Sequence, residues 1–221
     1  MLRLYDYLDS GNGYKVRLLL RLLDIPFERV ELDIMKGETR TPEFLAKNPN
    51  GKIPTLEWDD GRTLAESNAI LFHLAEGTPY LPEDAWDRAR VLSWMFFEQY
   101  SHEPYIAVAR FMLKHLEMTA ELEARLPDKQ ARGYAALDVM EAHLKDRDYF
   151  VGESMSIADI ALYAYTHVSG EGGFDLPRYP AVTAWCARVA SQPGHVPITK
   201  ASAGRRRAKP CADPANGVEK P

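Results

Sequence analysis

The sequence predicts two domains, an α/β domain over residues 1–77 and an all-helical domain over residues 83–195. The first 76 residues mix the two patterns in the order strand, helix, strand, loop, strand, strand, helix. From about residue 84 to residue 191 the periodicity is helical throughout. Between these parts, Gly77–Pro82 contains two prolines within four residues, which end the preceding helix and mark a linker.

Each element of the first domain has its own signal. The N-terminal residues alternate as in a strand, and the turn residues Ser10–Gly13 separate them from a helix with one apolar face. The sequence Asp59–Gly61 between two apolar runs is typical of a β-hairpin. We therefore expect strands over 1–7, 29–32, 55–58 and 63–65, helices over 14–23 and 67–75, and a short helix or turn at 42–45.

The second domain is predicted to contain four helices. The first, over 88–116, is interrupted near Pro104, because proline disrupts the helical hydrogen-bond pattern. The third begins at Ser156, whose spacing to Asp159 predicts a capping box, and its interior is apolar nearly all round, which predicts burial. The other two helices run over 120–144 and 181–191.

Charge is unevenly distributed along the 221 residues, which carry a formal net charge of −5. Residues 201–221 hold five basic and two acidic side chains, a net charge of +3, so the preceding 200 residues carry −8. An acidic body is a poor surface for nucleic acid. We interpret the basic run Arg205–Lys209 as a solvated part of a C-terminal tail over 201–221, and we expect no nucleic-acid partner.

The sequence also bears on compartment and cofactors. It contains no apolar run long enough for a transmembrane helix, and its N-terminus lacks the pattern of a signal peptide. Two cysteines, Cys186 and Cys211, are too few for a disulfide scaffold, and we interpret Cys186 as a packing residue. The six histidines form no metal-binding motif. We expect a cytoplasmic protein with no membrane partner and no metal.

Several separated motifs resemble the cytosolic glutathione S-transferase family. The segment Asn48–Leu56 contains the step Ile53-Pro54, and Leu64–Ile70 contains Glu66-Ser67. The segment Ser10–Arg17 resembles the serine-type bacterial members. Because these motifs occur in the right order, the resemblance extends over about residues 1–195. It implies a thioredoxin-like first domain that binds glutathione as co-substrate, an all-α second domain, and a homodimer.

The resemblance places Ser10 at the sulfur of bound glutathione, as a catalytic residue. A thiol with a pKa near 8.5 is only about 3% thiolate at pH 7, and the thiolate is the nucleophile. Lowering that pKa by ~2 units takes roughly 2.7 kcal/mol, within reach of a charge-assisted hydrogen bond and a helix dipole. Asn12 is the second catalytic candidate, because its amide can donate to the same sulfur. The alternatives are a helix-capping Ser10 and an Asn12 that serves only the turn.

The remaining glutathione-binding residues follow from the resemblance. It implies a cis bond at Ile53-Pro54, which frees the Ile53 N–H and C=O for the cysteinyl backbone of glutathione. Ser67 is expected to hold the γ-glutamyl carboxylate at a helix start, and Glu66 to accept from the neighbouring ammonium. Lys52 is expected to pair with the glycine carboxylate. The structural alternatives are a trans proline, a helix cap with an exposed acid, and a solvated lysine.

An electrophile pocket is expected between the domains, with Tyr105 and Phe111 on its helical side, although aromatic residues at this spacing also fit a core. The predicted function is a detoxifying glutathione transferase, which activates the glutathione thiolate for attack on small hydrophobic electrophiles. One alternative, which Asn12 favours, is a glutathione-dependent disulfide or peroxide reductase. The loop holds no cysteine, which argues against an enzyme-borne mixed disulfide. A further alternative is a non-catalytic interaction module.

Overall fold

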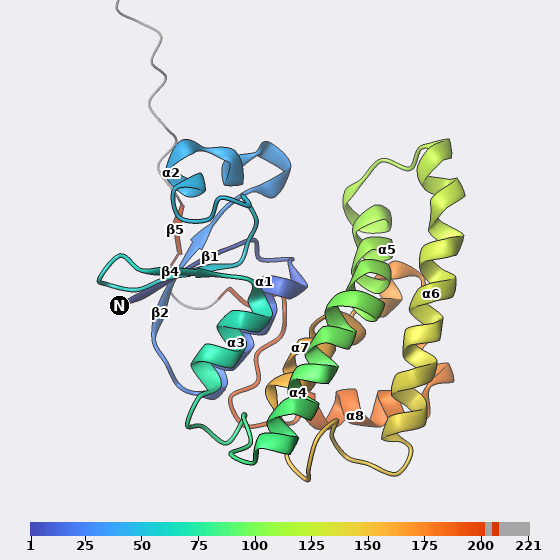
Figure 1. The fold of residues 1–221 in the computed structure, drawn as a ribbon. Coiled ribbons are helices and arrows are strands. Elements are labelled where there is room, and N and C mark those ends of the chain that lie inside the picture. The colour runs from blue at the N-terminus through green and yellow to red at the C-terminus, as the bar shows by residue number, and fades with distance from the viewer. Residues whose placement is uncertain (202–204, 208–221) are drawn as a thin grey trace, which may run out of the picture.

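The computed structural model describes residues 1–201 and the backbone of 205–207, and it places an α/β domain beside a helical domain (Figure 1). The sheet has the strand order β4-β3-β1-β2-β5. β1 runs parallel to β2 and antiparallel to β3, with Leu4 opposite Leu56, and β3 pairs with β4 as the predicted hairpin. The strands are β1 (Leu2–Asp6), β2 (Phe27–Glu31), β3 (Thr55–Glu57), β4 (Thr63–Ala65) and β5 (Arg205–Arg207).

The helices of the first domain are α1 (Gly11–Leu22), α2 (Pro42–Leu45) and α3 (Ser67–Ala75), with 3-10 turns at Ile34–Lys36 and Glu38–Arg40. α1 and α3 pack on the sheet through apolar side chains that include Val16, Leu20 and Ile70. α1 begins three residues before the predicted start at Tyr14, because residues 11–13 form its first turn. A side chain at Gly13 would overlap the Asp6 carboxylate, so glycine allows this close packing.

The second domain confirms the all-helical prediction. The predicted long helix is interrupted by a π-helical turn, Glu98–His102, and Pro104 lies in the first turn of the helix that follows. α7 is fully buried, and Ser156 and Asp159 form its predicted capping box. The helices are α4 (Ala85–Phe97), α5 (Glu103–His115), α6 (Ala120–Leu144), α7 (Ile157–Thr166) and α8 (Pro180–Ala190), with 3-10 turns at Ser169–Gly172 and Leu176–Arg178.

The two domains share one apolar core. Tyr14, Leu18 and Leu71 of the first domain join the buried side chains of α4 to α8 in one cluster. The chain after α8 returns to the first domain, where Tyr14 Oη donates to Val196 O at 2.7 Å. Because the domains are packed together in this way, the cavities between them have walls from both.

Most of the expected C-terminal tail, including Cys211, lies outside the described residues. The described part contains the short parallel strand β5. Within the described chain, no helix is both long enough and apolar enough to cross a membrane. Cys186 is partly buried against the core, and burial raises the pKa of its thiol to about 12, which agrees with a packing role.

Candidate functional site

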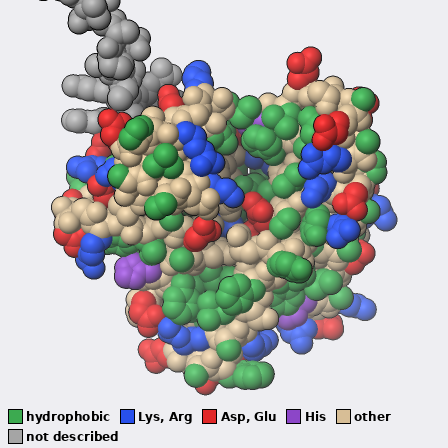
Figure 2. Space-filling view, turned by 45° about the horizontal axis from the view of Figure 1, so that its top comes forward, with side chains coloured by type: hydrophobic (Ala, Val, Ile, Leu, Met, Phe, Trp, Pro, Cys, Tyr) green, Lys and Arg blue, Asp and Glu red, His purple; other side chains and the backbone are tan. Residues whose placement is uncertain are grey.

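Two adjoining cavities lie between the domains, where Figure 2 shows the molecule hollowed. The larger has a volume of about 390 Å³ and the smaller about 130 Å³. Four residues line both cavities, Asn12, Lys52, Ile53 and Glu103. Of the residues predicted from the sequence, Ser10 and Phe111 line the larger cavity, whereas Pro54, Glu66 and Ser67 line the smaller.

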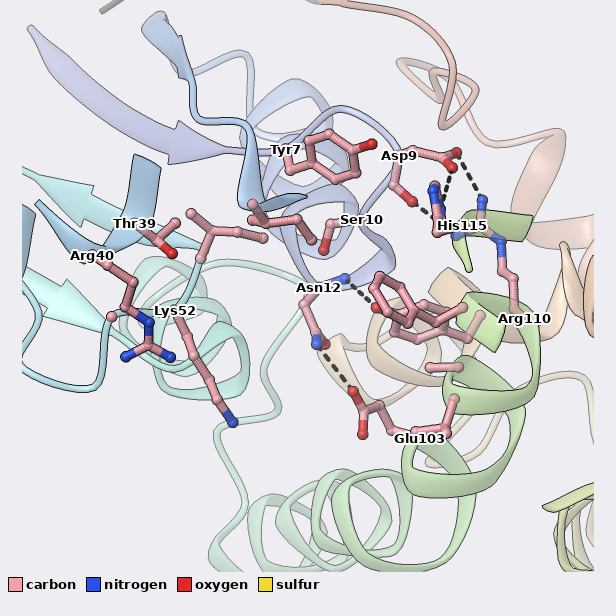
Figure 3. A pocket seen from close by; sticks show the side chains of 17 residues that line it. Tyr7, Asp9, Ser10, Asn12, Thr39, Arg40, Lys52, Glu103, Arg110 and His115 are labelled. Carbon is pink, nitrogen blue, oxygen red and sulfur yellow. Dashed lines mark hydrogen bonds and ion pairs between the residues drawn. The ribbon is translucent and has the colours of Figure 1, made fainter. Parts of the chain in front are cut away.

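Ser10 caps α1 and also faces the larger cavity (Figure 3). Its Oγ accepts a hydrogen bond from the Gly13 N–H at 3.3 Å. A hydroxyl that accepts one bond still has its own proton to donate. Capping and donation to an anion are therefore compatible, and the positive end of the α1 dipole adds to the donation.

The Asn12 amide is held between the two domains. Its Oδ1 accepts from Ser67 Oγ at 3.4 Å, and its Nδ2 donates to Glu103 Oε1 at 3.2 Å (Figure 3). These two partners fix which end of the amide is the donor. Because an amide nitrogen carries two hydrogens, one N–H remains for a ligand.

Lys52 and Arg40 project side by side at one edge of the larger cavity (Figure 3). Both side chains are exposed, and Lys52 forms no ion pair within the described chain. The loop that carries Lys52 is held by Asn48, whose Nδ2 donates to Lys52 O at 2.8 Å. The arrangement offers positive charge to a carboxylate. Arg40 was left out of the predicted site, because no sequence motif singles it out.

The peptide bond between Ile53 and Pro54 is cis, which confirms that expectation. Glu66 has φ 67° at the start of α3, and its side chain makes no capping bond. Ser67 is the first residue of α3 and is buried. It lines the smaller cavity, so the N-terminus of α3 lies at that cavity. Glu66 and Ser67 thus present an exposed carboxylate beside an anion-binding helix end.

A buried ion pair lies beneath this helix start. Lys15 Nζ is 2.8 Å from Glu98 Oε1, and both side chains are fully buried. Lys15 Nζ also donates to Ser67 Oγ at 3.4 Å. The pair therefore connects α1 and the π-helical turn to Ser67 of α3, which lines the smaller cavity.

A cluster of charges closes the other end of the larger cavity. Asp9 Oδ1 lies 2.7 Å from Arg110 NH2 and 3.0 Å from Lys114 Nζ, and Asp9 Oδ2 lies 2.9 Å from His115 Nε2. Burial alone would raise the pKa of Asp9, but hydrogen bonds from Lys114 and Arg110 outweigh it and hold that pKa below its usual range. The cluster ties the residue before Ser10 to α5.

The two predicted aromatic residues of the electrophile pocket separate in the structure. Phe111 lines the larger cavity together with Ala107 and Val108 of α5. Tyr105 is not among the described residues that line it. Its ring instead packs beneath the Lys129 and Arg132 cations of α6.

Sequence reasoning missed Tyr7, Glu103 and Tyr165, which all line the larger cavity. Tyr165 Oη accepts from the Asn12 N–H at 3.3 Å across 153 residues of sequence, so no local pattern predicts this contact. The break at Pro104 was the available signal for Glu103, because it places that residue at the start of a helix. In the described residues, no group of three or more His, Cys, Asp or Glu side chains is placed to hold a metal ion.

Comparisons with known proteins agree with this geometry. The glutathione S-transferase N-terminal domain model matches residues 1–76, and the C-terminal domain model of that family matches residues 94–193. A glutathione S-transferase-like protein from Fusarium, LUC7, is 33% identical over 85% of this chain and 87% of its own. The disulfide-bond oxidoreductase YfcG of Escherichia coli is 30% identical over 87% of this chain and 92% of its own.

Solved structures resemble the whole two-domain unit. A glutathione S-transferase from Pseudomonas fluorescens superposes with a TM-score of 0.89 and 55% identity, covering 90% of this chain and 99% of that one. A glutathione transferase from Burkholderia graminis, solved with two glutathione molecules bound per subunit, gives a TM-score of 0.78 and 29% identity, covering 87% of this chain and 85% of that one.

Proposed function

Because the chain belongs to the glutathione S-transferase family, we propose that its interdomain site binds glutathione and activates the thiol for attack on small hydrophobic electrophiles. The observation that carries the proposal is the spatial order of the binding groups along the two cavities. Positive charge at Lys52, the backbone of Ile53 and the acid–serine pair Glu66-Ser67 at α3 follow one another along these cavities. Ser10 and Asn12 stand beside this series.

The residues present fit the chemistry of glutathione. Its glycine carboxylate suits Lys52, and the amides of its cysteinyl residue suit the backbone of Ile53. Its γ-glutamyl end carries an ammonium for Glu66 and a carboxylate for Ser67 at the α3 N-terminus. Opposite charges of the ligand thus meet opposite charges of the protein at both ends.

The thiol then belongs near Ser10 and Asn12, whose hydrogens are available to a thiolate. Donation from both groups lowers the thiol pKa, because hydrogen bonds to the charged form stabilise it. The apolar wall of Ala107, Val108 and Phe111 offers the electrophile a place in the same cavity. Transfer would then proceed by attack of the glutathione sulfur on the electrophile, with no covalent bond to the protein.

A second candidate is glutathione-dependent reduction of disulfides or peroxides on the same site. The Asn12 amide held toward the cavity favours it, as does the similarity to a relative named as a disulfide-bond oxidoreductase. Since no cysteine lines either cavity in the described chain, both electrons would come from glutathione. A non-catalytic module is the weaker candidate, because it needs none of Ser10, Lys52 and Glu66.

We further propose a cytoplasmic, detoxifying homodimer. Large apolar side chains are exposed on and just after α4, with Trp86 at 73%, Phe96 at 69% and Tyr100 at 83% of their surface. Contact of these side chains with a second copy would remove them from water.

Calorimetric titration with glutathione, followed by assays with an activated chloroarene and with a small disulfide, tests the proposal. Turnover of the chloroarene supports the transferase, and turnover of the disulfide alone supports the reductase. Binding without turnover of either supports the non-catalytic module. Absence of glutathione binding would contradict both enzyme functions.

A further inference from the structure

Glu103 stands where the two cavities meet. It is the first residue of α5 and lines both cavities, so it faces the glutathione side and the electrophile side at once. Its Oε1 accepts from Asn12 Nδ2 at 3.2 Å, across the domain boundary (Figure 3). The carboxyl therefore lies beside the amide that the proposed function assigns to the thiol.

The other carboxyls that line the cavities are already committed. Asp9 forms ion pairs with Arg110 and Lys114, and Glu66 lies exposed at the start of α3, at the γ-glutamyl end of the proposed site. No Lys, Arg or His of the described chain forms an ion pair with Glu103. Glu103 is thus the lining carboxyl that is both near the reacting sulfur and free to change its protonation.

The groups around Glu103 come from four elements. Lys15 on α1, Lys52 on the loop before β3 and the Asn12 amide favour its charged form, whereas Glu98 on the π-helical turn opposes it. Tyr165 on α7 contacts Asn12, and burial together with the Glu103 charge raises the pKa of its phenol, so Tyr165 stays neutral. Burial dominates and raises the pKa of Glu103 above its usual range.

We propose that Glu103 takes up the thiol proton of bound glutathione and delivers it to the departing group or the adduct, a role that rests on the proposed function. A thiolate and an ionised carboxylate in one site repel each other, so a single shared negative charge is the favourable state. Uptake of the proton by Glu103 leaves the thiolate next to a neutral acid. The acid then faces the larger cavity, where the product forms.

The steps balance for a disulfide substrate. The S–H bond of glutathione breaks and its proton goes to a Glu103 oxygen. The sulfur electron pair forms a bond to one disulfide sulfur, the substrate S–S bond breaks, and the departing sulfur takes the bonding pair and then the Glu103 proton. Addition to an α,β-unsaturated carbonyl follows the same path, with the proton delivered to the carbon next to the carbonyl group.

An activated chloroarene differs at the last step. Chloride departs with the bonding pair and needs no proton, so the proton on Glu103 passes to solvent. Glu103 is therefore needed as a donor for disulfides and unsaturated carbonyls, but not for the chloroarene. Comparing these substrates distinguishes proton delivery from a structural role, because loss of a structural role would slow all three reactions.

The test compares Glu103→Gln with wild type on a small disulfide, an α,β-unsaturated aldehyde and an activated chloroarene. Glutamine keeps the size of the side chain and still accepts from Asn12, but it carries no acidic proton. We expect turnover of the proton-requiring substrates to fall roughly 100-fold, within the usual range for loss of a general acid. Turnover of the chloroarene should change less than about 3-fold, because in the variant the thiol still ionises by releasing its proton to solvent. Glutathione affinity should be unchanged.

Two further variants complete the comparison. Glu103→Ala removes both the proton and the Asn12 contact, so all three reactions should slow. Glu153→Gln makes the same chemical change at an exposed position away from the cavities and should match wild type. Equal rates for Glu103→Gln and wild type on every substrate, with a slow Glu103→Ala, would reduce Glu103 to a positioning residue and overturn the proposal.

Proton release on binding gives a readout that needs no turnover. Calorimetry in buffers of different ionisation enthalpy counts the protons released, and ultraviolet absorbance counts the thiolate formed. Wild type should form thiolate with little proton release, whereas Glu103→Gln should release one proton for each thiolate. Release of one proton for each thiolate in wild type would overturn the role of Glu103 but not the proposed function. Wild type that binds no glutathione would overturn the proposed function as well.

Discussion

Acidification should weaken the fold through one buried histidine, His102, which lies in the π-helical turn behind the site. Its side chain is fully buried, and its Nε2 lies 2.8 Å from Thr166 Oγ1. The other ring nitrogen is buried and has no partner within the described chain. Burial, with a smaller contribution from Lys15, lowers the pKa of His102 to about 4, although Glu98 acts in the opposite direction.

This lowered pKa determines the direction and the size of the change in folding stability with pH. Above about pH 6.5 the ring is neutral in both the folded and the unfolded chain, so it adds no pH dependence. As the pH falls below that value the unfolded chain binds the proton first, and folding is weakened. With a folded pKa of about 4, the loss is about 2 kcal/mol at about pH 5 and approaches roughly 3 kcal/mol below pH 4.

Urea unfolding of wild type and His102→Gln at about pH 7.5 and about pH 5 measures this loss. Glutamine offers Thr166 a polar partner without titrating, so the variant should lose about 2 kcal/mol less than wild type on acidification. His73→Gln, at an exposed histidine, should lose as much as wild type. If His102→Gln and wild type lose the same amount, then His102 is protonated in the folded protein, and the assignment of a neutral buried ring is refuted.

Three further predictions concern the site and the assembly. Ser10→Ala should still bind glutathione, but the pKa of the bound thiol should rise and turnover at neutral pH should fall roughly 10- to 100-fold, with partial recovery at alkaline pH. An unchanged thiol pKa would assign the role to Asn12 or to main-chain donors. Glu66→Gln should weaken glutathione binding about 10- to 150-fold without changing the melting temperature, and an unchanged affinity would make Glu66 a surface acid only. Sedimentation should give about twice the 25.0 kDa chain mass, and a single-chain mass at micromolar protein would contradict the homodimer.

Local signals predicted much of the fold. The helices over 67–75 and 120–144 begin and end in the structure where the sequence placed them, and the Ser156–Asp159 capping box is present. Each of these depends on residues within a few positions of one another, which is the range over which periodicity and capping act. The start of α1 was placed too late, because its first turn is built from turn-type residues packed against Asp6.

The residues of the candidate site also fall into two groups, those predicted from local motifs and those that depend on long-range contacts. Ser10, Ile53-Pro54 and Glu66-Ser67 belong to short motifs and were predicted. The contact of Asn12 with Glu103 joins residues 91 positions apart, and that with Tyr165 spans 153. Such contacts exist only once the helical domain has packed on the first, so the residues that complete the site required the structure.

Calorimetric titration of the wild-type protein with glutathione tests the central claim most directly, because both the proposed function and the role of Glu103 depend on that binding. Saturable binding is predicted, weakened in parallel by Lys52→Met at the glycine end and by Glu66→Gln at the γ-glutamyl end. Loss of charge at each end should cost affinity separately, since the two groups face opposite ends of the ligand. A wild-type titration without saturable heat, or affinities that neither substitution changes, would contradict the assignment of this interdomain site to glutathione.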